Sequence, residues 1–435
     1  MNRYVKMITT VVVGLSGVAR AEQMSYLDNG TIRIGVDLDR GGSITYFSEK
    51  NGPNTINSHD LGRQIQQSYY AGPQPFGKAH PGWKGWPWNP IGTGDVYGHP
   101  SKIVEHTNDG KSIHVTMIPM QWALDNVPGE CTFETWISLE GRVAHVRCRL
   151  NNHRADTTQY PANDQELPAV YTVGTIYRLF TYDGGTPFTG GPLRQIHNAG
   201  PPWAGWTATE GWSALVNDEN RGVGIIHPGV YRYTGGFHDK PGRGGPKDNS
   251  TGYMSPIRKE ILDANIRYEY QYDLVLDTLE SIRAYAVAHR IQDTRPDYHF
   301  DRDRRHWIYV NATDAGFPLD GGLRIKPGRN DPQMIGPEQW WSAESAPKLF
   351  IRAAFRTRQT RAEIYWSVPG KGFSTDRRVD FAIIADDKPH TYEIDLAASP
   401  IYRGTITGLR FDPVPEGGDG DEIRVESITW KPDPK

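Results

Sequence analysis

The chain has 435 residues, with 48 basic and 51 acidic side chains and a formal net charge of −3, so it is long enough for more than one domain with a core of its own. This near balance of charge argues against nucleic acid as a partner and supplies no basic segment for a membrane surface. The 47 glycines, 32 prolines, 13 tryptophans and 22 tyrosines are typical of a turn-rich, aromatic β protein rather than a helical one.

Residues 1–21 have the pattern of a secretory signal peptide. Arg3 and Lys6 supply positive charge, an apolar run follows at 7–18, and residues 19–21 (Ala-Arg-Ala) offer a cleavage site. The apolar run is too short for a stable membrane span, and no second long run follows it. We therefore expect an exported protein, secreted or periplasmic, without a membrane span.

From residue 31 onward, short alternating runs separated by turn residues predict β-strands. Three hairpins and one long strand that ends in a short helix are expected, at residues 32–48, 101–120, 131–150 and 265–290. Many strands in one long unit predict a large antiparallel β-sandwich, and we place it at residues 22–292.

Residues 69–97 stand apart from these strands, because their many prolines and glycines break both helices and central strands. Trp83, Trp86 and Trp88 all lie in this segment, which predicts a long ordered loop. The rings would present flat apolar faces, and the flat partner expected for an exported protein is a sugar ring. The alternative is that they cover one end of the sandwich, since large aromatic side chains bury well.

The clearest hairpin, residues 131–150, is expected to turn at Glu140-Gly141. This turn places Cys131 and Cys148 on the core face, diagonally related. An oxidising compartment would permit a disulfide after a small register change. Two buried free thiols are the alternative.

The other face of this hairpin is polar and aromatic at once. In the same register Glu134 faces Arg147, and Trp136 faces His145. A carboxylate and a guanidinium would bind hydroxyl groups there, and an indole would stack on a sugar ring. The alternative is a solvent face with a cross-strand ion pair, which contributes roughly 0.2–1 kcal/mol.

Three acidic residues are candidates for catalysis. Glu166 lies at the entrance of a predicted strand, and Glu210 ends the aromatic loop WAGWTATEGW, so each has apolar neighbours of the kind that raise a carboxyl pKa. Hydrolysis of a glycosidic bond needs two carboxyl groups that flank the bond. Glu166 and Glu210 are therefore the first pair and Asp95 is the reserve, with a structural role in a loop as the alternative for each.

The charged segment 293–305 predicts a linker, and residues 306–435 predict a second, smaller β-sandwich. Acidic residues at 412–422 gather oxygen ligands near Asp419 that suit calcium. A solvated loop explains this run as well, because its spacing fits no defined calcium loop. No His/Cys spacing matches a zinc site, so that calcium is the only metal or cofactor expected.

Two stretches resemble carbohydrate-active proteins. The opening TIRIGVDLDRGGSITYFSEKNG, with Gly62-Arg63 soon after it, resembles the galactose mutarotase-like supersandwich, a fold of sugar epimerases, many glycoside hydrolases and polysaccharide lyases. The strands of residues 306–435 resemble a carbohydrate-binding module. Together the resemblances cover most of the mature chain. They imply an all-β fold and a polysaccharide or oligosaccharide partner, and they leave the reaction open.

These patterns favour a secreted glycoside hydrolase that uses Glu166 and Glu210. The residues expected to bind its substrate are aromatic or form hydrogen bonds with hydroxyl groups: Arg63, Tyr70, Trp83, Trp86, Trp88, Trp136, His145, Arg147, Trp203 and Trp212. A polysaccharide lyase is the first alternative, because β-elimination needs a Tyr or His base and an Arg clamp. A non-catalytic glycan-binding protein is the second.

Overall fold

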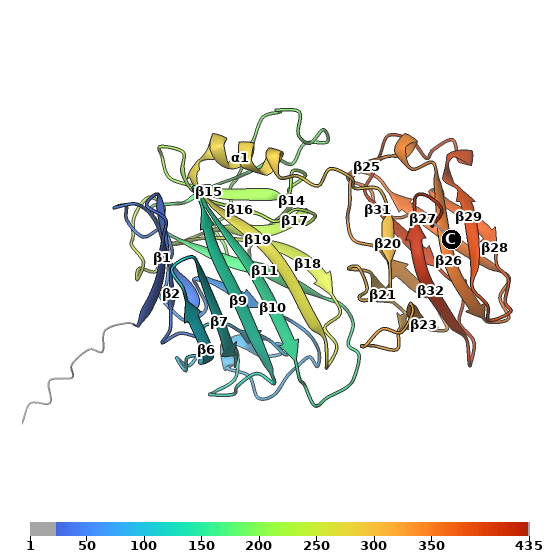
Figure 1. Ribbon diagram of the computed structural model, residues 1–435, viewed down its shortest axis with the longest axis horizontal. Coiled ribbons are helices and arrows are strands. Elements are labelled where there is room, and N and C mark those ends of the chain that lie inside the picture. The colour runs from blue at the N-terminus through green and yellow to red at the C-terminus, as the bar shows by residue number, and fades with distance from the viewer. Residues whose placement is uncertain (1–22, 434–435) are drawn as a thin grey trace, which may run out of the picture.

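The computed structural model describes residues 23–433, so the predicted signal peptide at 1–21 lies outside the described residues. The chain forms two antiparallel β-sandwiches that lie side by side, a large one followed by a smaller one (Figure 1). The described residues contain one α-helix, α1 (Leu279–Ala288). The expected all-β class, with a large sandwich before a small one, is confirmed.

One sheet of the large sandwich has ten strands. Its main path in space is β1 (Met24–Asp28), β2 (Ile32–Asp37), β3 (Ser43–Glu49), β4 (Ile65–Ser68), β11 (Asn163–Val173), β18 (Thr251–Glu260), β17 (Arg232–His238) and β14 (Ala204–Thr207). Two short strands extend it from β4, namely β5 (Pro90–Ile91) and β8 (Met120–Gln121). Because β4, β11 and β18 are neighbours, residues far apart in the sequence meet on this sheet.

The other sheet of the large sandwich has nine strands. Their spatial order is β13 (Arg194–Ile196), β12 (Arg178–Thr181), β15 (Trp212–Val216), β16 (Arg221–Ile226), β19 (Arg267–Thr278), β10 (Val143–Asn152), β9 (Cys131–Glu140), β7 (Ser112–Ile118) and β6 (Lys102–Asn108). Strand β9 shows why one face is inside: Phe133 and Ile137 are buried, whereas the alternate residues are half-buried. The inner faces of the two sheets enclose one apolar core.

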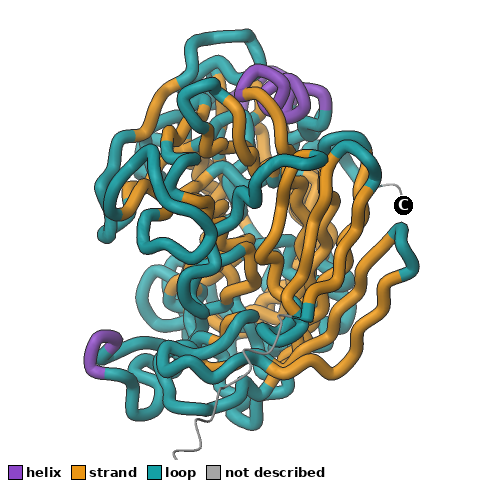
Figure 2. Tube along the Cα trace, turned by 90° about the vertical axis from the view of Figure 1, so that its left-hand side faces the viewer, coloured by secondary structure: helices purple, strands orange, loops and turns teal. Residues whose placement is uncertain are grey.

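Helix α1 covers part of the outer face of the nine-stranded sheet. Figure 2 shows it as the long purple helix at the top of the view. Thr278 caps its N-terminus by accepting a hydrogen bond from the backbone N–H of Ser281. Ile282 and Ala286 are its buried residues, and they pack with Trp212 in an apolar cluster separate from the main core.

The predicted hairpin of β2 and β3 is present, and glycine is required at its turn. Gly42 has a φ of +72°, in the left-handed region that favours glycine. A Cβ atom there would lie 2.6 Å from Cγ1 of Val115. The turn therefore fits tightly against strand β7 of the opposite sheet.

The smaller sandwich has a core of its own, which includes Trp307 and Trp366. Its six-stranded sheet has the path β22 (Ala312–Thr313), β23 (Leu323–Pro327), β32 (Glu422–Thr429), β26 (Lys348–Arg356) and β29 (His390–Asp395), with β20 (Asp297–His299) paired to β32. Its five-stranded sheet has the order β21 (Ile308–Val310), β24 (Gln333–Ile335), β31 (Gly408–Asp412), β27 (Arg361–Ser367) and β28 (Arg378–Ala382). Strands β25 (Trp341–Ser342) and β30 (Thr405–Ile406) pair separately.

The segment 293–305, expected to be a linker, is built into the smaller sandwich. Strand β20 pairs with β32 inside it. Arg304 is buried and forms ion pairs with Asp263 of the large sandwich at 2.6 Å and with Asp314 at 2.7 Å. A polar, charged composition predicted a linker, but here Arg304 is neutralised by two carboxylates where the two sandwiches meet.

The hairpin of β9 and β10 has a register two residues away from the expected one. Glu140 pairs with Val143, so the turn consists of Gly141, with a φ of +54°, and Arg142. Glu134 is therefore opposite Arg149, and Trp136 is opposite Arg147. The two faces of the hairpin are nevertheless those predicted. Each residue of β9 is opposite a residue of β10 two positions further along than expected, and a shift of two residues keeps every side chain on the same side of the sheet.

The two cysteines are free and buried. Cys131 pairs with Asn152, and Cys148 pairs with Thr135, so the thiols are not opposite each other. Burial raises the pKa of Cys148 to about 12. Both side chains are core residues in this structure, which is the second of the two alternatives that the sequence left open.

Candidate functional site

A cleft of about 810 Å³ lies on the ten-stranded sheet. Four of its lining residues stand in register across β11, β18, β17 and β14: Glu166, Ile257, Arg232 and Thr207. These side chains point away from the main core, because their neighbours Leu167 and Tyr233 belong to the core. The cleft is therefore on the outer face of this sheet, the face opposite to the one that packs on β9 and β10.

Glu166 is held on this floor by two tyrosine hydroxyls. Tyr70 donates a hydrogen bond to its Oε2 at 2.8 Å, and Tyr253 donates a short hydrogen bond to its Oε1. Each carboxylate oxygen thus has one hydroxyl donor, which fixes the plane of the carboxylate. Glu166 and Tyr70 are only half-buried, so the group remains open to the cleft.

Both tyrosines are held in the protonated form. Burial, and then the negative charge of Glu166, raises the pKa of Tyr70 and of Tyr253 well above the ordinary value of 10.0. A tyrosine that serves as a base needs the opposite shift. These two hydroxyls are therefore suited to positioning the carboxylate rather than to abstracting a proton.

Tryptophan side chains form the walls. Trp86 and Trp203 line the cleft and are half-buried. The ring of Trp203 lies 4.9 Å from that of Tyr253, and the ring of Trp86 lies 6.0 Å from that of Tyr70, measured between centroids. Trp83 supports Trp86 from outside, with ring centroids 4.8 Å apart. Of the three tryptophans of the long loop, Trp86 is the one that lines the cleft.

Trp88, the third tryptophan of that loop, is a core residue. It is completely buried, and its backbone pairs with Ala71 on the other side of the loop. The sequence left two interpretations of this loop open, stacking on a sugar or covering the sandwich. The structure divides them between neighbouring residues, with Trp86 facing the cleft and Trp88 facing the core.

Asp164 and Arg232 form an ion pair at the edge of the cleft. Their side chains meet in two contacts of 2.9 and 3.3 Å, and both line the cleft. The guanidinium of Arg232 therefore has its counter-ion within the chain. The carboxylate of Asp164 is paired with a cation, whereas the protein groups that donate hydrogen bonds to Glu166 are neutral hydroxyls.

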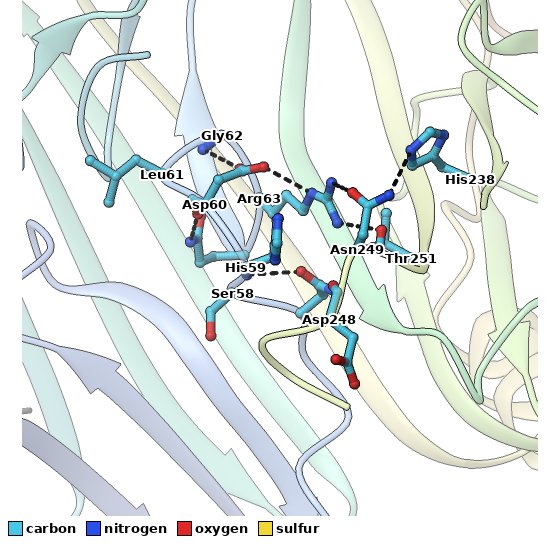
Figure 3. A network of polar contacts seen from close by, with 12 residues as sticks. Ser58, His59, Asp60, Leu61, Gly62, Arg63, His238, Asp248, Asn249 and Thr251 are labelled. Carbon is cyan, nitrogen blue, oxygen red and sulfur yellow. Dashed lines mark hydrogen bonds and ion pairs between the residues drawn. The ribbon is translucent and has the colours of Figure 1, made fainter. Parts of the chain in front are cut away.

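Arg63 is not one of the residues that line the cleft, and it lies in a separate polar network (Figure 3). Its guanidinium donates to the carbonyl oxygen of Asn249 at 2.7 Å and to Oδ1 of the same residue at 2.9 Å, and it pairs with Asp60 at 3.2 Å. Asn249 in turn contacts Nε2 of His238 at 3.4 Å. The charge of Arg63 reaches Tyr171, where it opposes burial, the main cause of the raised pKa of that tyrosine.

Glu210, expected to pair with Glu166, does not lie in the cleft. It is buried beneath α1, where Arg283 donates to both of its oxygens at 3.0 and 2.8 Å. Trp212 donates to it through Nε1 at 3.0 Å, and the backbone N–H of Phe188 donates at 2.9 Å. Trp212 is itself completely buried. This carboxylate is saturated with donors and inaccessible, so the structure does not bring the expected pair together.

Asp95, the reserve candidate, organises a turn. Its buried carboxylate accepts hydrogen bonds from the backbone N–H groups of Tyr97, His99 and Asn126 at 2.8 to 2.9 Å. The ring of His99 contacts the same carboxylate at 2.9 Å. All these partners belong to loops outside the cleft.

Trp136, His145 and Arg147 lie on the other sheet, far around the sandwich from Glu166. The indole of Trp136 has His114 stacked on one face, with centroids 4.7 Å apart, and the guanidinium of Arg147 3.8 Å from its centroid. His145 contacts the carboxylate of Asp273 at 2.8 Å. Because its flat faces already have partners, Trp136 is not a stacking platform in this structure.

Sequence patterns missed several residues of the cleft, among them Tyr253, Arg232 and Glu338. Tyr253 and Ile257 alternate along β18, so period-two analysis of that strand could have placed them on one face. Arg232 and Thr234 alternate with the core residue Tyr233 along β17 in the same way, whereas Glu338 carried no such signal. Glu338 comes from the smaller sandwich, and only the packing of the two sandwiches brings it to the cleft.

The described residues contain no group of three or more His, Cys, Asp and Glu side chains placed to hold a metal ion. Asp419, the expected centre of a calcium site, is exposed and pairs with Arg329 at 2.8 Å. Within residues 23–433, no helix is long and apolar enough to cross a membrane.

No model of a protein family matches the chain, and no curated protein matches it. Similar solved structures include a galactose mutarotase-like protein from Lactobacillus casei, 11% identical, which aligns over 58% of this chain and 100% of its own with a TM-score of 0.37. The Slr1438 protein from Synechocystis is 10% identical over 61% of this chain and 99% of its own, with a TM-score of 0.39. The GH36 alpha-galactosidase AgaB from Geobacillus stearothermophilus is 8% identical over 60% of this chain and 40% of its own, with a TM-score of 0.36. At these TM-scores the likenesses carry no argument about activity.

Proposed function

We propose that the protein is an exported carbohydrate-active enzyme that hydrolyses a glycosidic bond of a polysaccharide or oligosaccharide in this cleft. The observation that carries the proposal is the Glu166 carboxylate, fixed by Tyr70 and Tyr253 between tryptophan walls. Indole rings suit the apolar faces of sugars. A half-buried carboxylate between them suits proton transfer at a glycosidic bond.

In this proposal Glu166 is the general base. A water molecule beside the carboxylate would lose a proton to it as the water oxygen attacks the anomeric carbon. The two tyrosines keep the carboxylate oriented while the sugar ring lies against Trp86 or Trp203. The volume of the cleft, about 810 Å³, is in the range of sites that enclose a small ligand or a few sugar units.

The lyase alternative receives less support from the geometry. β-Elimination needs a base and a cation that neutralises the uronate carboxylate. The tyrosines of the cleft are held protonated, and the nearby guanidinium groups are already paired, Arg232 with Asp164 and Arg63 with Asp60. An elimination mechanism would first have to release one of these pairs.

The proposed location outside the cytoplasm rests on the signal-peptide pattern of residues 1–21. It fits a glycan substrate, because such polymers are abundant there. Proteolytic removal of these residues would be seen as a new N-terminus at Glu22 in protein recovered from the periplasm or medium.

The test is incubation of the purified protein with a panel of neutral and acidic polysaccharides and aryl glycosides. We expect new reducing ends without new ultraviolet absorbance, because hydrolysis creates no double bond. New absorbance would instead establish a lyase. Binding of a glycan without any cleavage across the panel would reject the enzyme proposal in favour of a glycan-binding protein.

A further inference from the structure

The cleft is not made by the large sandwich alone. Three carboxyl side chains line it, those of Asp164, Glu166 and Glu338. Asp164 is paired with Arg232, so it is occupied. Glu338 belongs to the smaller sandwich and reaches the cleft from across the boundary between the sandwiches.

The segment that carries Glu338 is fixed on both sides. It follows β24, and the backbone N–H of Gly336 donates to Leu409 at 2.9 Å, while that of Gln339 donates to Thr407 at 3.1 Å. The side chain of Gln339 accepts a hydrogen bond from the hydroxyl of Tyr298 at 2.8 Å. A carboxyl group between two such anchors has a defined position, which a catalytic group requires.

The surroundings of Glu338 differ from those of Glu166. Among residues 23–433, the side chain of Glu338 has one hydrogen-bond donor, Nε1 of Trp340, at 3.3 Å from Oε1. Burial raises the pKa of this carboxyl, and the Trp340 donor and the charge of Arg232 only partly oppose that effect. Glu166 and Glu338 therefore stand in unlike environments, the arrangement that separates an acid from a base.

Glu166 and Glu338 line the same cleft from different sandwiches. Arg232, whose charge acts on Glu338, is in register with Glu166 across one intervening strand. A general acid and a general base that use a water molecule need carboxyl groups about 6.5–9.5 Å apart, whereas direct attack by a carboxylate needs roughly 5 Å. The first arrangement is the one required of Glu166 and Glu338.

We infer that Glu338 is the general acid that completes the site, an inference that rests on the proposed glycosidase function. As the bond between the anomeric carbon and the glycosidic oxygen breaks, its electron pair stays on that oxygen, which takes the proton of the Glu338 carboxyl. The oxygen of water forms the new bond to the anomeric carbon, and its proton goes to Glu166. One water is consumed, and exchange with solvent restores both carboxyl groups.

With Glu338 as the general acid, the smaller sandwich takes part in catalysis. Its strands resemble a carbohydrate-binding module, which would bind glycan at a distance from the active site. Here the loop after β24 supplies a lining residue of the main cleft, and Trp340 beside it has its ring 6.3 Å from that of Tyr231 in the large sandwich. The two sandwiches would act as one catalytic unit.

The test compares Glu338→Gln with the wild type on two substrates that share a glycan part. One has a nitrophenol leaving group, which departs without a proton, and the other has an alkyl alcohol, which needs one. We expect the variant to lose about 10²- to 10⁴-fold in kcat/KM on the alkyl substrate and at most a few-fold on the nitrophenyl substrate. Glu344→Gln, an exposed position of the same sandwich, is the matched control and should cleave both normally.

A second readout does not depend on cleavage. Because the folded-state pKa of Glu338 is raised, its charged form disfavours folding, so the wild type should lose stability relative to Glu338→Gln as pH rises through that pKa. Equal activity of wild type and variant on both substrates, or an equal loss on both, would overturn the role of Glu338 and leave the proposed function standing. Cleavage of no glycan by the wild type would instead reject the function and the inference together.

Discussion

Glu210 and Arg283 form a two-point ion pair beneath helix α1, with nitrogen–oxygen distances of 3.0 and 2.8 Å. The pair ties the loop before β15 to helix α1, and Glu210 is only 3% exposed. The negative charge of Glu210 is balanced by Arg283, and both of its carboxylate oxygens accept hydrogen bonds from protein donors. The pair thus joins an element of the sheet to the helix that covers it.

Glu210→Gln should therefore damage folding and not chemistry. Removal of one partner of a buried ion pair costs about 3–5 kcal/mol, because the other charge is left without its counter-ion. Urea unfolding would measure this loss. Activity per folded molecule should be unchanged, and a stable variant with abolished activity would show that Glu210 has the catalytic role first expected from the sequence.

Substitution of Trp88 and of Trp86 in the aromatic loop should have different effects, the first on stability and the second on substrate binding. Trp88→Ala should destabilise the protein by about 3–5 kcal/mol, because it empties a fully buried site. Trp86→Ala should leave most of the stability and raise KM, with a loss of binding on the order of 1 kcal/mol. Thermal unfolding and steady-state kinetics on the same preparations separate the two. A normal KM for Trp86→Ala would remove this ring from the sugar-binding wall.

Removal of the tyrosine hydroxyls that contact Glu166 should lower the rate of cleavage while the protein stays folded. Tyr70→Phe and Tyr253→Phe each delete one donor to a charged acceptor, worth about 1.5–3 kcal/mol, so kcat/KM should fall roughly 10- to 100-fold. Tyr177→Phe is the control, because its hydroxyl pairs with the exposed Asp218 at 2.6 Å, away from the cleft. A faster reaction in either cleft variant would mean that the hydroxyls hinder Glu166.

Acid should weaken the contact between the sandwiches at Glu260. Burial raises the pKa of this carboxyl, but His306 at 2.7 Å and Arg258 outweigh burial and bring it below the ordinary 4.5. A lowered folded-state pKa means that the ionised group stabilises the fold above its unfolded pKa and that this contribution is lost as pH falls. The unfolding free energy should drop more steeply below pH 4.5 for the wild type than for Glu260→Gln. Parallel curves would contradict this.

The periodicity of the sequence was sufficient to predict the strands and their buried faces, but it was not sufficient to predict which residues form the candidate site. Alternation along β9 predicts its faces whatever the register, because a two-residue shift keeps parity. The turn at Gly141 and Arg142 lies one residue beyond the expected turn, since Gly141 adopts a positive φ at the first turn position. Local pattern therefore fixes which face is buried, while turn geometry fixes which residues pair.

The candidate site shows a different limit. Glu166 and Tyr70 were expected to take part, and the structure brings them together. Glu210 has a similar aromatic sequence context, yet it meets Arg283 on α1, a partner distant in the sequence. Whether a carboxylate faces a cleft or a guanidinium is decided by strand order and by the packing of the sandwiches. The surroundings of Glu338 follow from the same packing, which no short motif encodes.

The most direct test of the account is Glu166→Gln, measured on a glycan that the wild type cleaves. We expect a fall of about 10²- to 10⁴-fold in kcat/KM, with normal thermal unfolding and retained glycan binding. Glu105→Gln, an exposed position on the edge strand β6 of the opposite sheet, should keep full activity as the matched control. Undiminished cleavage by a folded Glu166→Gln variant would contradict the central claim that this carboxylate carries the chemistry.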